Sequence, residues 1–200
     1  MESVKKVKAA WRKNSRETRD SFYGNFLAQK SLDHVNDALV ANLNTLIPKT
    51  PAVWASYRAI GSEADPHSVV KFSKWISWVF PRIEGDQLKF YQPLDEHSFH
   101  ANKWNILEPI PEKSSDVALD DVDGFIVPGL VFDRHGGRLG NGRGYYDRTL
   151  KGLRAKKIGL GYSVQIVEQV PRDEHDVLMD HVVTETAVYS CRPGLDKRGN

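Results

Sequence analysis

The chain has 200 residues, of which 40% are hydrophobic and 27% charged, and its formal net charge is +2. These values are ordinary for one globular domain over residues 1–200, and so small a charge gives no reason to expect nucleic acid as a partner. The single cysteine, Cys191, excludes an intrachain disulfide framework. No apolar run approaches the roughly 18 residues of a membrane span, so we expect a cytoplasmic protein with no membrane partner.

Two helices are predicted at the start of the chain. The first is basic and amphipathic and ends near residue 20; its Lys8 and Arg12 lie one turn apart. Like charges so placed repel each other unless an anion binds between them, and a solvated basic face is the alternative. The second helix is expected over residues 31–46, with Ser31 or Asn25 as its N-cap. The apolar stripes comprise Val4, Val7 and Trp11 in the first helix and Leu32, Val35, Leu39, Leu43 and Leu46 in the second.

A buried strand is predicted over residues 52–57, followed by a loop and by a helix that Asp65 caps and that runs to about Trp78. A carboxylate in a strand-to-helix loop of an α/β protein lies where ligands usually bind, which makes Glu63 a candidate. The alternative is an exposed loop acid. Two further strands, joined by a Glu-Gly-Asp turn, are expected at residues 79–82 and 87–91.

Two groups of potential metal ligands follow these strands. His97 and His100 have H-x-x-H spacing, but no second cysteine or histidine cluster is near them, so zinc is not expected. Residues 114–123 hold four aspartates without the spacing or central glycine of an EF-hand, which favours a polar connecting loop. Trp104 can stack on a planar ring, and ordinary core or lid packing is its alternative.

The most informative stretch is residues 127–150, VPGLVFDRHGGRLGNGRGYYDRTL, which holds six of the fifteen glycines. A short strand at 124–127 leads in, glycines follow at alternate positions, and a helix is expected to begin at Tyr145. This order suits a phosphate site, because glycines let backbone N–H groups approach an anion and a helix N-terminus adds positive potential. Arg138 and Arg143 add charge that can bind phosphate oxygens, and Asp147 can hold a divalent cation.

Several familiar motifs are absent from the sequence. The P-loop pattern, the dinucleotide G-x-G-x-x-G, the serine-hydrolase G-x-S-x-G and H-E-x-x-H do not occur, so those classes are excluded. A plain glycine-rich turn remains the alternative for the loop. Asp133 is expected to hold this loop through backbone hydrogen bonds rather than to bind metal. Tyr146 and Arg148 are expected to support it by packing.

Strands and helices alternate along the chain, which predicts an α/β fold with a mostly parallel sheet covered on both faces. Later strands are expected at residues 157–162 and 181–184. The single domain then consists of helices over 2–47, a core over 52–190, and a tail over 191–200 that has little to bury and should fray.

The string RLGNGRGYYDR, preceded by VPGLVFDRHG, resembles the signature of the 5-formyltetrahydrofolate cyclo-ligases, also called 5,10-methenyltetrahydrofolate synthetases. The resemblance extends from Lys8 to Thr184 and implies a three-layer α/β/α fold. It also implies ATP and 5-formyltetrahydrofolate as substrates, Mg²⁺ as cofactor, and cyclisation to 5,10-methenyltetrahydrofolate with release of ADP and phosphate. A monomer is expected.

The resemblance also implies roles for particular residues. Arg143 and Tyr145 are expected to be catalytic, and Asp147 with Asp180, the second aspartate of a D-x-x-x-D motif, to hold Mg²⁺. The sequence departs from the family after Glu63, where Ala-Asp-Pro replaces I-x-T. The ATP site is expected to comprise Lys8, Arg12, Arg138, Leu139, Gly140, Asn141, Gly142, Arg143, Gly144, Tyr145 and Tyr146. The folate site is expected to comprise Arg58, Glu63, Trp104 and Tyr145.

Two other classes of function stay open at this point. One is a non-catalytic folate- or nucleotide-binding paralogue that kept the loop and lost turnover. The other is an RNA-binding module that uses the basic helix and surface tryptophans, although the sequence has no RNP-like aromatic strand or G-x-x-G clamp.

Overall fold

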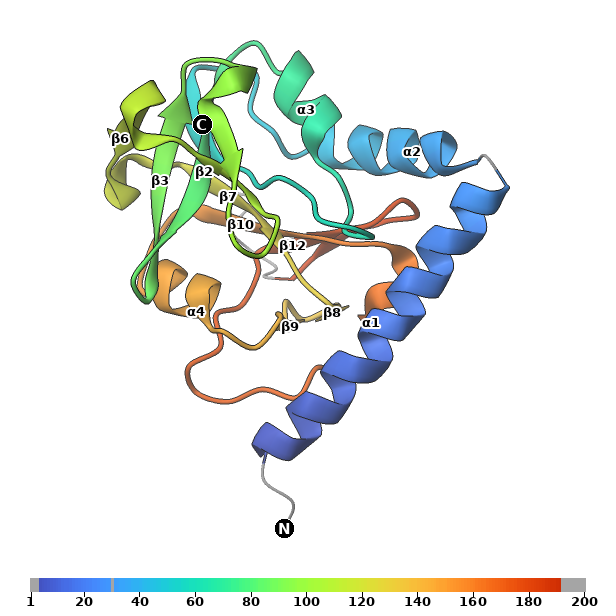
Figure 1. The fold of residues 1–200 in the computed structure, drawn as a ribbon. Coiled ribbons are helices and arrows are strands. Elements are labelled where there is room, and N and C mark those ends of the chain that lie inside the picture. The colour runs from blue at the N-terminus through green and yellow to red at the C-terminus, as the bar shows by residue number, and fades with distance from the viewer. Residues whose placement is uncertain (1–3, 30, 192–200) are drawn as a thin grey trace.

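The computed structural model describes residues 4–29 and 31–191 and centres on an eight-stranded sheet (Figure 1). In spatial order the strands are β13 (Val188–Ser190), β12 (His181–Val183), β10 (Lys156–Leu160), β7 (Gly124–Pro128), β1 (Ala52–Ala55), β2 (Ile76–Glu84), β3 (Gln87–Pro93) and β6 (Ser114–Val117). The strands from β12 to β2 run parallel, and β13, β3 and β6 join antiparallel at the two sides. The predicted mostly parallel sheet is therefore confirmed.

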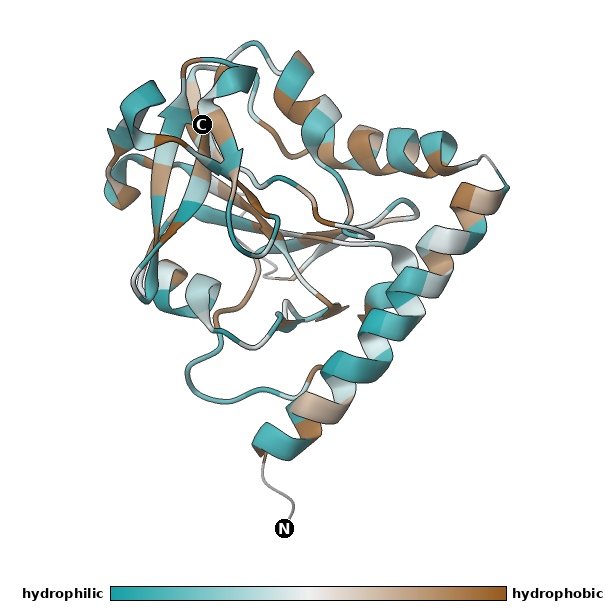
Figure 2. Cartoon of the chain, viewed as in Figure 1, coloured by the Kyte–Doolittle hydropathy of each residue, from teal (hydrophilic) through white to brown (hydrophobic). Residues whose placement is uncertain are grey.

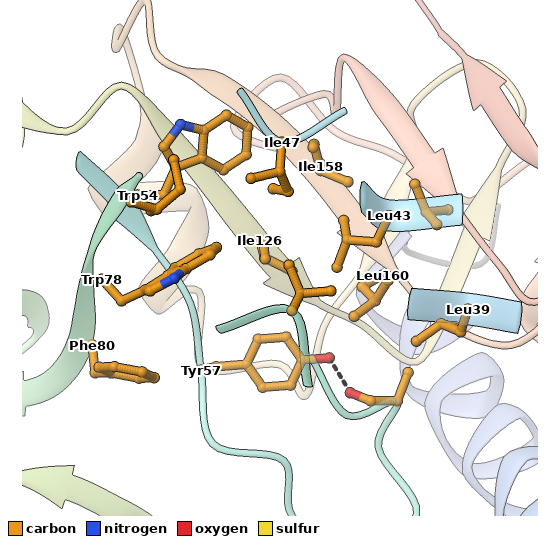
Figure 3. Close-up of a cluster of buried hydrophobic side chains, with 14 of the residues drawn as sticks. Leu39, Leu43, Ile47, Trp54, Tyr57, Trp78, Phe80, Ile126, Ile158 and Leu160 are labelled. Carbon is orange, nitrogen blue, oxygen red and sulfur yellow. Dashed lines mark hydrogen bonds between the residues drawn. The ribbon is translucent and has the colours of Figure 1, made fainter. Parts of the chain in front are cut away.

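Helices pack on both faces of this sheet. The helices are α1 (Val4–Ala28), α2 (Leu32–Asn44), α3 (His67–Phe72) and α4 (Tyr145–Leu150). On one face, Leu39 and Leu43 of α2 pack against Ile126 and its neighbours on the central strands (Figure 3). On the other face, Leu150 of α4 packs in the same cluster as Phe125. Adjacent residues of β7 thus bury their side chains on opposite faces, as strand alternation requires, and the three-layer prediction is confirmed.

Two small hairpins carry loops that are important for the candidate site. The hairpin of β8 (residues 131–133) and β9 (residues 138–139) leads into the glycine-rich loop at residues 140–144. The hairpin of β4 (residues 99–101) and β5 (residues 107–109) contains a turn at residues 102–106. The small strands are β4 (Phe99–Ala101), β5 (Leu107–Pro109), β8 (Val131–Asp133), β9 (Arg138–Leu139) and β11 (Ile166–Val167). The 3-10 helices are η1 (Glu96–Ser98), η2 (Pro111–Lys113), η3 (Leu119–Asp121) and η4 (Ser163–Gln165).

The helix predicted to run to Trp78 is shorter than expected. α3 ends at Phe72, whose side chain is 69% exposed, and β2 begins at Ile76. Ile76, Trp78 and Phe80 are buried on one face of β2, a period of two that pairing with β1 reinforces. The helical interpretation of residues 73–78 was wrong, because over so short a stretch the spacing of the apolar residues fits both a helix and a strand.

Other boundaries also differ from expectation. α1 runs to Ala28, so Asn25 lies inside it and does not cap α2; Ser31 occupies the N-cap position without a side-chain hydrogen bond. The connector expected to be a loop contains β6, and β13 was not predicted. The tail at residues 192–200 lies outside the described residues. Over the described part of the chain, every helix is too short or too polar to cross a membrane.

Candidate active site

A cavity of about 1250 Å³ opens at the carboxyl ends of β1 and β7, where Tyr57 and Pro128 line it. A single ligand usually occupies roughly 300–1,000 Å³, so this cavity has room for two ligands side by side. Nine lysine or arginine side chains and five carboxylates line it. Every site residue predicted from the sequence lies on its wall except Asp180.

Helix α1 contacts the glycine-rich loop through its basic side. Arg12 Nε donates a hydrogen bond to the carbonyl oxygen of Gly140 at 3.1 Å, and Arg16 Nη2 donates to Asn141 Oδ1 at 3.0 Å. Lys8 is only 6% exposed. The side of α1 that faces the glycine-rich loop is therefore basic, whereas Phe22, Tyr23 and Phe26 farther along the helix pack against the core. The helix as a whole is largely hydrophilic (Figure 2). The solvated-face alternative was wrong for these residues.

The glycine-rich loop offers backbone donors to the cavity. Gly142 (φ +95°) and Gly144 (φ +68°) adopt a left-handed conformation that favours glycine, and a Cβ on Gly142 would lie 3.1 Å from the Arg12 guanidinium. Within the described chain, the backbone N–H groups of Asn141, Gly142 and Arg143 have no protein acceptor. Because α4 has only six residues, these amides contribute more to an anion site than its dipole does.

The prediction for Asp133 is confirmed. This carboxylate is fully buried, and it accepts hydrogen bonds from the backbone N–H groups of His135 and Gly137, both at 2.8 Å, and of Val170 at 2.9 Å. It therefore holds the turn that precedes the loop. Arg148 supports the other end, because its guanidinium donates to the carbonyl oxygens of Arg143 and Asp86.

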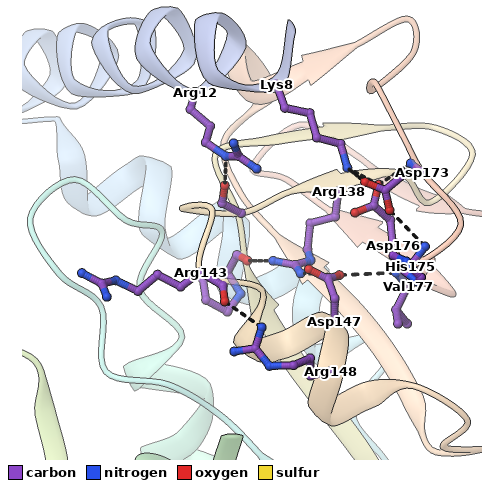
Figure 4. A network of polar contacts seen from close by, with 12 residues as sticks. Lys8, Arg12, Arg138, Arg143, Asp147, Arg148, Asp173, His175, Asp176 and Val177 are labelled. Carbon is purple, nitrogen blue, oxygen red and sulfur yellow. Dashed lines mark hydrogen bonds and ion pairs between the residues drawn. The ribbon is translucent and has the colours of Figure 1, made fainter. Parts of the chain in front are cut away.

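The two arginines expected at the phosphates differ in position. Arg138 is buried; its Nη1 donates to the carbonyl oxygen of Pro128 at 3.2 Å, and its Nη2 lies 2.9 Å from Asp147 Oδ1. Its charge thus orients Asp147. Arg143 points away from this cluster (Figure 4), and its guanidinium lies 4.6 Å from the ring centre of Trp104. In this structure Arg143 therefore stands between the two ends of the cavity.

Two aspartates that the sequence analysis did not select face Lys8. Lys8 Nζ lies 2.8 Å from Asp173 Oδ2 and 2.6 Å from Asp176 Oδ2 (Figure 4). Burial lowers the pKa of Lys8, but its hydrogen bonds to the two aspartates outweigh that effect, and the pKa is raised overall. The hydrogen bond from Lys8 likewise lowers the pKa of Asp173.

Asp180 lies elsewhere. Its carboxylate accepts a hydrogen bond from the backbone N–H of Lys157 at 2.8 Å, at the start of β10, which is the opposite edge of the parallel sheet from the cavity. The structure therefore does not bring Asp180 to Asp147. The first aspartate of the same D-x-x-x-D motif, Asp176, is the one that lines the cavity. The backbone N–H of its neighbour Val177 donates to Asp147 Oδ1 at 3.3 Å.

These residues fit a magnesium ion that arrives with a ligand. Among the described residues, no group of three or more histidine, cysteine, aspartate or glutamate side chains could hold a metal ion alone. Mg²⁺, however, commonly takes one or two carboxylates together with phosphate oxygens and water. Asp147 and Asp176, linked through Val177, are the carboxylates positioned for such a role.

The other end of the cavity contains two carboxylates with little exposure, Glu63 and Glu108. Glu63 Oε2 accepts a hydrogen bond from the backbone N–H of Ile60 at 3.2 Å, and Arg19 Nη1 of α1 lies 3.9 Å from Glu63 Oε1. Burial raises the pKa of Glu63, and Arg19 offsets only part of that effect. Glu108, which the sequence analysis did not select, is 4% exposed. Its Oε1 accepts from the backbone N–H of Ile83 at 3.2 Å.

Polar and aromatic contacts hold the wall around these acids. Asn102 donates to Glu108 at 2.8 Å and accepts hydrogen bonds from the backbone of the turn, so that Trp104 faces the cavity. The Arg58 guanidinium lies 4.3 Å from the ring centre of Phe99, and its Nη2 donates to Glu96 at 2.6 Å. The Arg58 Nη1 lies 2.9 Å from His67 Nδ1, so both terminal nitrogens have protein partners and Arg58 supports the wall of the cavity.

The fold and the cavity define a class of protein: a three-layer α/β protein with a basic, glycine-rich anion site beside an aromatic pocket that holds buried carboxylates. A sequence profile of the 5-formyltetrahydrofolate cyclo-ligase family matches residues 73–185, more than half of the chain. The chain belongs to the 5-formyltetrahydrofolate cyclo-ligase family.

Individual relatives agree with this assignment. The chain is 36% identical over 147 residues to the mitochondrial 5-formyltetrahydrofolate cyclo-ligase of Arabidopsis thaliana, covering 64% of this chain and 52% of the relative. It is 35% identical over 102 residues to that of Escherichia coli K12, covering 50% and 55%. In these alignments the chain spans about half the length of the curated relatives it matches.

Solved structures extend the similarity to nearly the whole chain. The 5,10-methenyltetrahydrofolate synthetase of Aquifex aeolicus is 31% identical over 94% of both chains, with a TM-score of 0.79. The 5,10-methenyltetrahydrofolate synthetase of Mycoplasma pneumoniae, at 23% identity and a TM-score of 0.69, shares the fold.

Proposed function

We propose that this protein catalyses the ATP- and Mg²⁺-dependent cyclisation of 5-formyltetrahydrofolate to 5,10-methenyltetrahydrofolate, with release of ADP and phosphate. The observation that carries the proposal is the continuous cavity, which joins the basic loop and helix at one end to buried carboxylates and Trp104 at the other. Membership of the cyclo-ligase family supports it.

The proposed chemistry begins at the formyl oxygen, which attacks the γ-phosphorus of ATP as the bond to the bridging oxygen breaks and ADP departs. The former formyl oxygen is then part of a phosphate ester and can leave. The 10-nitrogen next bonds to the activated carbon and loses its proton, and inorganic phosphate departs with that oxygen. Phosphoryl transfer of this kind depends mainly on alignment and charge neutralisation.

The basic end of the cavity would supply that alignment. Lys8, Arg12 and the backbone N–H groups of the loop at residues 140–144 would bind the phosphate oxygens. Asp147 and Asp176 would hold Mg²⁺, which neutralises charge on the phosphates when it is bound. Arg143, at the boundary between the two ends, would stabilise the phosphoryl group in transit.

The other end would bind the folate. The reduced pteridine carries several N–H donors, and the carboxylate oxygens of Glu63 would accept hydrogen bonds from them. Trp104 and Tyr145 both line the cavity and would contact the flat ring system. Arg58 would contribute indirectly, because its contacts with Phe99 and Glu96 hold the wall of the folate pocket in place.

One assay tests the proposal. Protein, 5-formyltetrahydrofolate and magnesium are mixed, ATP is added, and the near-ultraviolet absorption of the methenyl product is followed, with the non-hydrolysable β,γ-imido analogue of ATP as control. The band should grow with ATP and stay absent with the analogue. ATP binding without the band would instead indicate a nucleotide-binding paralogue. Binding to RNA that magnesium-ATP does not compete would favour the RNA-binding alternative.

A further inference from the structure

We propose that Asp173 is a positioning residue for the nucleotide: it would retain the Lys8 ammonium in the cavity if Asp176 turned to a metal ion that arrives with the phosphates. This inference rests on the proposed function, because it assigns the phosphate end of the cavity to ATP. It concerns a residue outside both the glycine-rich loop and the pair of candidate magnesium ligands.

The geometry at Lys8 allows such an exchange of partners. A lysine ammonium has three N–H donors, and here two of them bind Asp173 Oδ2 at 2.8 Å and Asp176 Oδ2 at 2.6 Å. One donor is left for a phosphate oxygen. If Asp176 moved to a metal ion, a second donor would become free, and Asp173 would still hold the nitrogen in place.

The two aspartates are placed for different tasks. Asp176 is the more enclosed, with 15% of its side chain exposed, and its neighbour Val177 binds Asp147. Asp173 is 43% exposed, and its Oδ1 accepts a hydrogen bond from the backbone N–H of His175 at 3.0 Å. The turn also holds Asp176, whose Oδ2 accepts a hydrogen bond from the backbone N–H of Asp173 at 2.8 Å. Both carboxylates face Lys8 (Figure 4), but only Asp176 adjoins Val177, the residue whose backbone N–H binds the candidate metal ligand Asp147.

Electrostatics and positioning predict opposite signs for the loss of Asp173. A carboxylate near a polyphosphate repels it, so simple removal of the negative charge would tighten ATP binding. A positioning role predicts the reverse, since an unrestrained lysine side chain loses conformational freedom when it binds the phosphate. The sign of the change in nucleotide affinity therefore separates the two accounts.

The matched pair for the experiment is Asp173→Asn and Glu174→Gln. Both remove one negative charge from the same turn, but Glu174 has 86% of its side chain exposed and lies outside the residues that line the cavity. The dissociation constant of magnesium-ATP would be measured by isothermal titration calorimetry, and KM for ATP and for 5-formyltetrahydrofolate by the absorbance assay. Thermal unfolding would verify that both variants are folded.

We expect Asp173→Asn to weaken magnesium-ATP binding by about tenfold, as the loss of a charge-assisted hydrogen bond does, with KM for the folate unchanged. Glu174→Gln should bind ATP as the parent does or slightly tighter. Asp173→Glu, which keeps the charge, should recover most of the affinity. The proposal is overturned if Asp173→Asn binds ATP as tightly as Glu174→Gln, or if it weakens folate and nucleotide equally. Parent protein that binds ATP but forms no methenyl product would instead overturn the proposed function and leave the affinity comparison intact.

Discussion

The two ends of the cavity hold their carboxylates in different ways. At the basic end, acids pair with cations from distant segments: Asp173 and Asp176 with Lys8 of α1, and Asp147 with Arg138. At the other end, Glu63 accepts a hydrogen bond from its own loop, and its ion-pair partner among the described residues is 3.9 Å away. The pKa of Asp173 is accordingly lowered by its partner, whereas burial raises the pKa of Glu63.

This difference suits the two ends to different tasks: the acids at the basic end can exchange partners when a ligand binds, whereas Glu63 is already held in place before binding. The cations of these ion pairs are buried, but their acids are more exposed and line the cavity, so the pairs can exchange partners with an incoming phosphate or metal ion. A buried carboxylate held by backbone groups changes little on binding and offers a fixed acceptor. We therefore expect substitutions at the basic end to alter nucleotide affinity and turnover, and substitutions at the other end to alter folate affinity.

The largest expected effect is at Asp147. Asp147→Asn should reduce kcat/KM on the order of a thousandfold, because an amide keeps the contact to Arg138 but is a poor magnesium ligand. Calorimetric titration with ATP, with and without magnesium, should show that the magnesium dependence of binding is lost while thermal unfolding is nearly unchanged. Equal affinity for ATP in parent and variant at every magnesium concentration would remove Asp147 from the metal site.

Arg143 tests where the boundary between the two ends lies. Arg143→Ala should lower kcat on the order of a hundredfold, or about 3 kcal/mol, if the guanidinium stabilises the transferred phosphoryl group. Trp104→Leu is the matched variant, since it removes the ring on which Arg143 stacks and should raise KM for the folate by about tenfold with kcat little changed. If both variants show the same modest rise in folate KM, Arg143 supports Trp104 and has no role at the phosphate.

Local features were predictable from the sequence. The glycine-rich loop, the helix that begins at Tyr145 and the role of Asp133 depend on neighbouring residues, and the structure agrees with all three predictions. The parallel sheet followed from the alternation of elements. The end of α3 was not predictable, because the choice between helix and strand from Ile76 onward depends on pairing with β1, a tertiary interaction.

The partners of the charged residues depend on the tertiary fold. Lys8 and Asp173 are 165 residues apart, and no spacing in the sequence connects them. The D-x-x-x-D motif indicated the segment, but the sequence did not show which of its aspartates lines the cavity; Asp176 does, whereas Asp180 accepts a hydrogen bond from the backbone N–H of Lys157. The burial of Glu108 was not predictable, because a glutamate between a leucine and a proline has no local feature that distinguishes it from an exposed one.

Substitution of Glu63 should have a smaller effect than substitution of Asp147 or Arg143, and it should appear in the KM for the folate. Glu63→Gln should raise KM for 5-formyltetrahydrofolate by about tenfold and leave ATP affinity unchanged, since a neutral amide accepts hydrogen bonds from the pteridine less strongly than a carboxylate. Steady-state kinetics with each substrate varied in turn measures the two constants. A change in ATP affinity of the same size would contradict the separation of the two ends.

The same substitution should alter stability in a pH-dependent way. Because burial raises the pKa of Glu63 above its ordinary value of 4.5, ionisation of this carboxyl disfavours the folded state, and stability present below pH 4.5 is lost as pH rises through the raised pKa. A glutamine side chain does not ionise, so at pH 7 the Glu63→Gln variant should unfold at higher denaturant concentration than the parent. The difference should close as the pH falls below 4.5. If the variant instead unfolds at lower denaturant concentration than the parent at pH 7, and this deficit closes on acidification, attraction to Arg19 outweighs burial and Glu63 is held like the acids at the basic end.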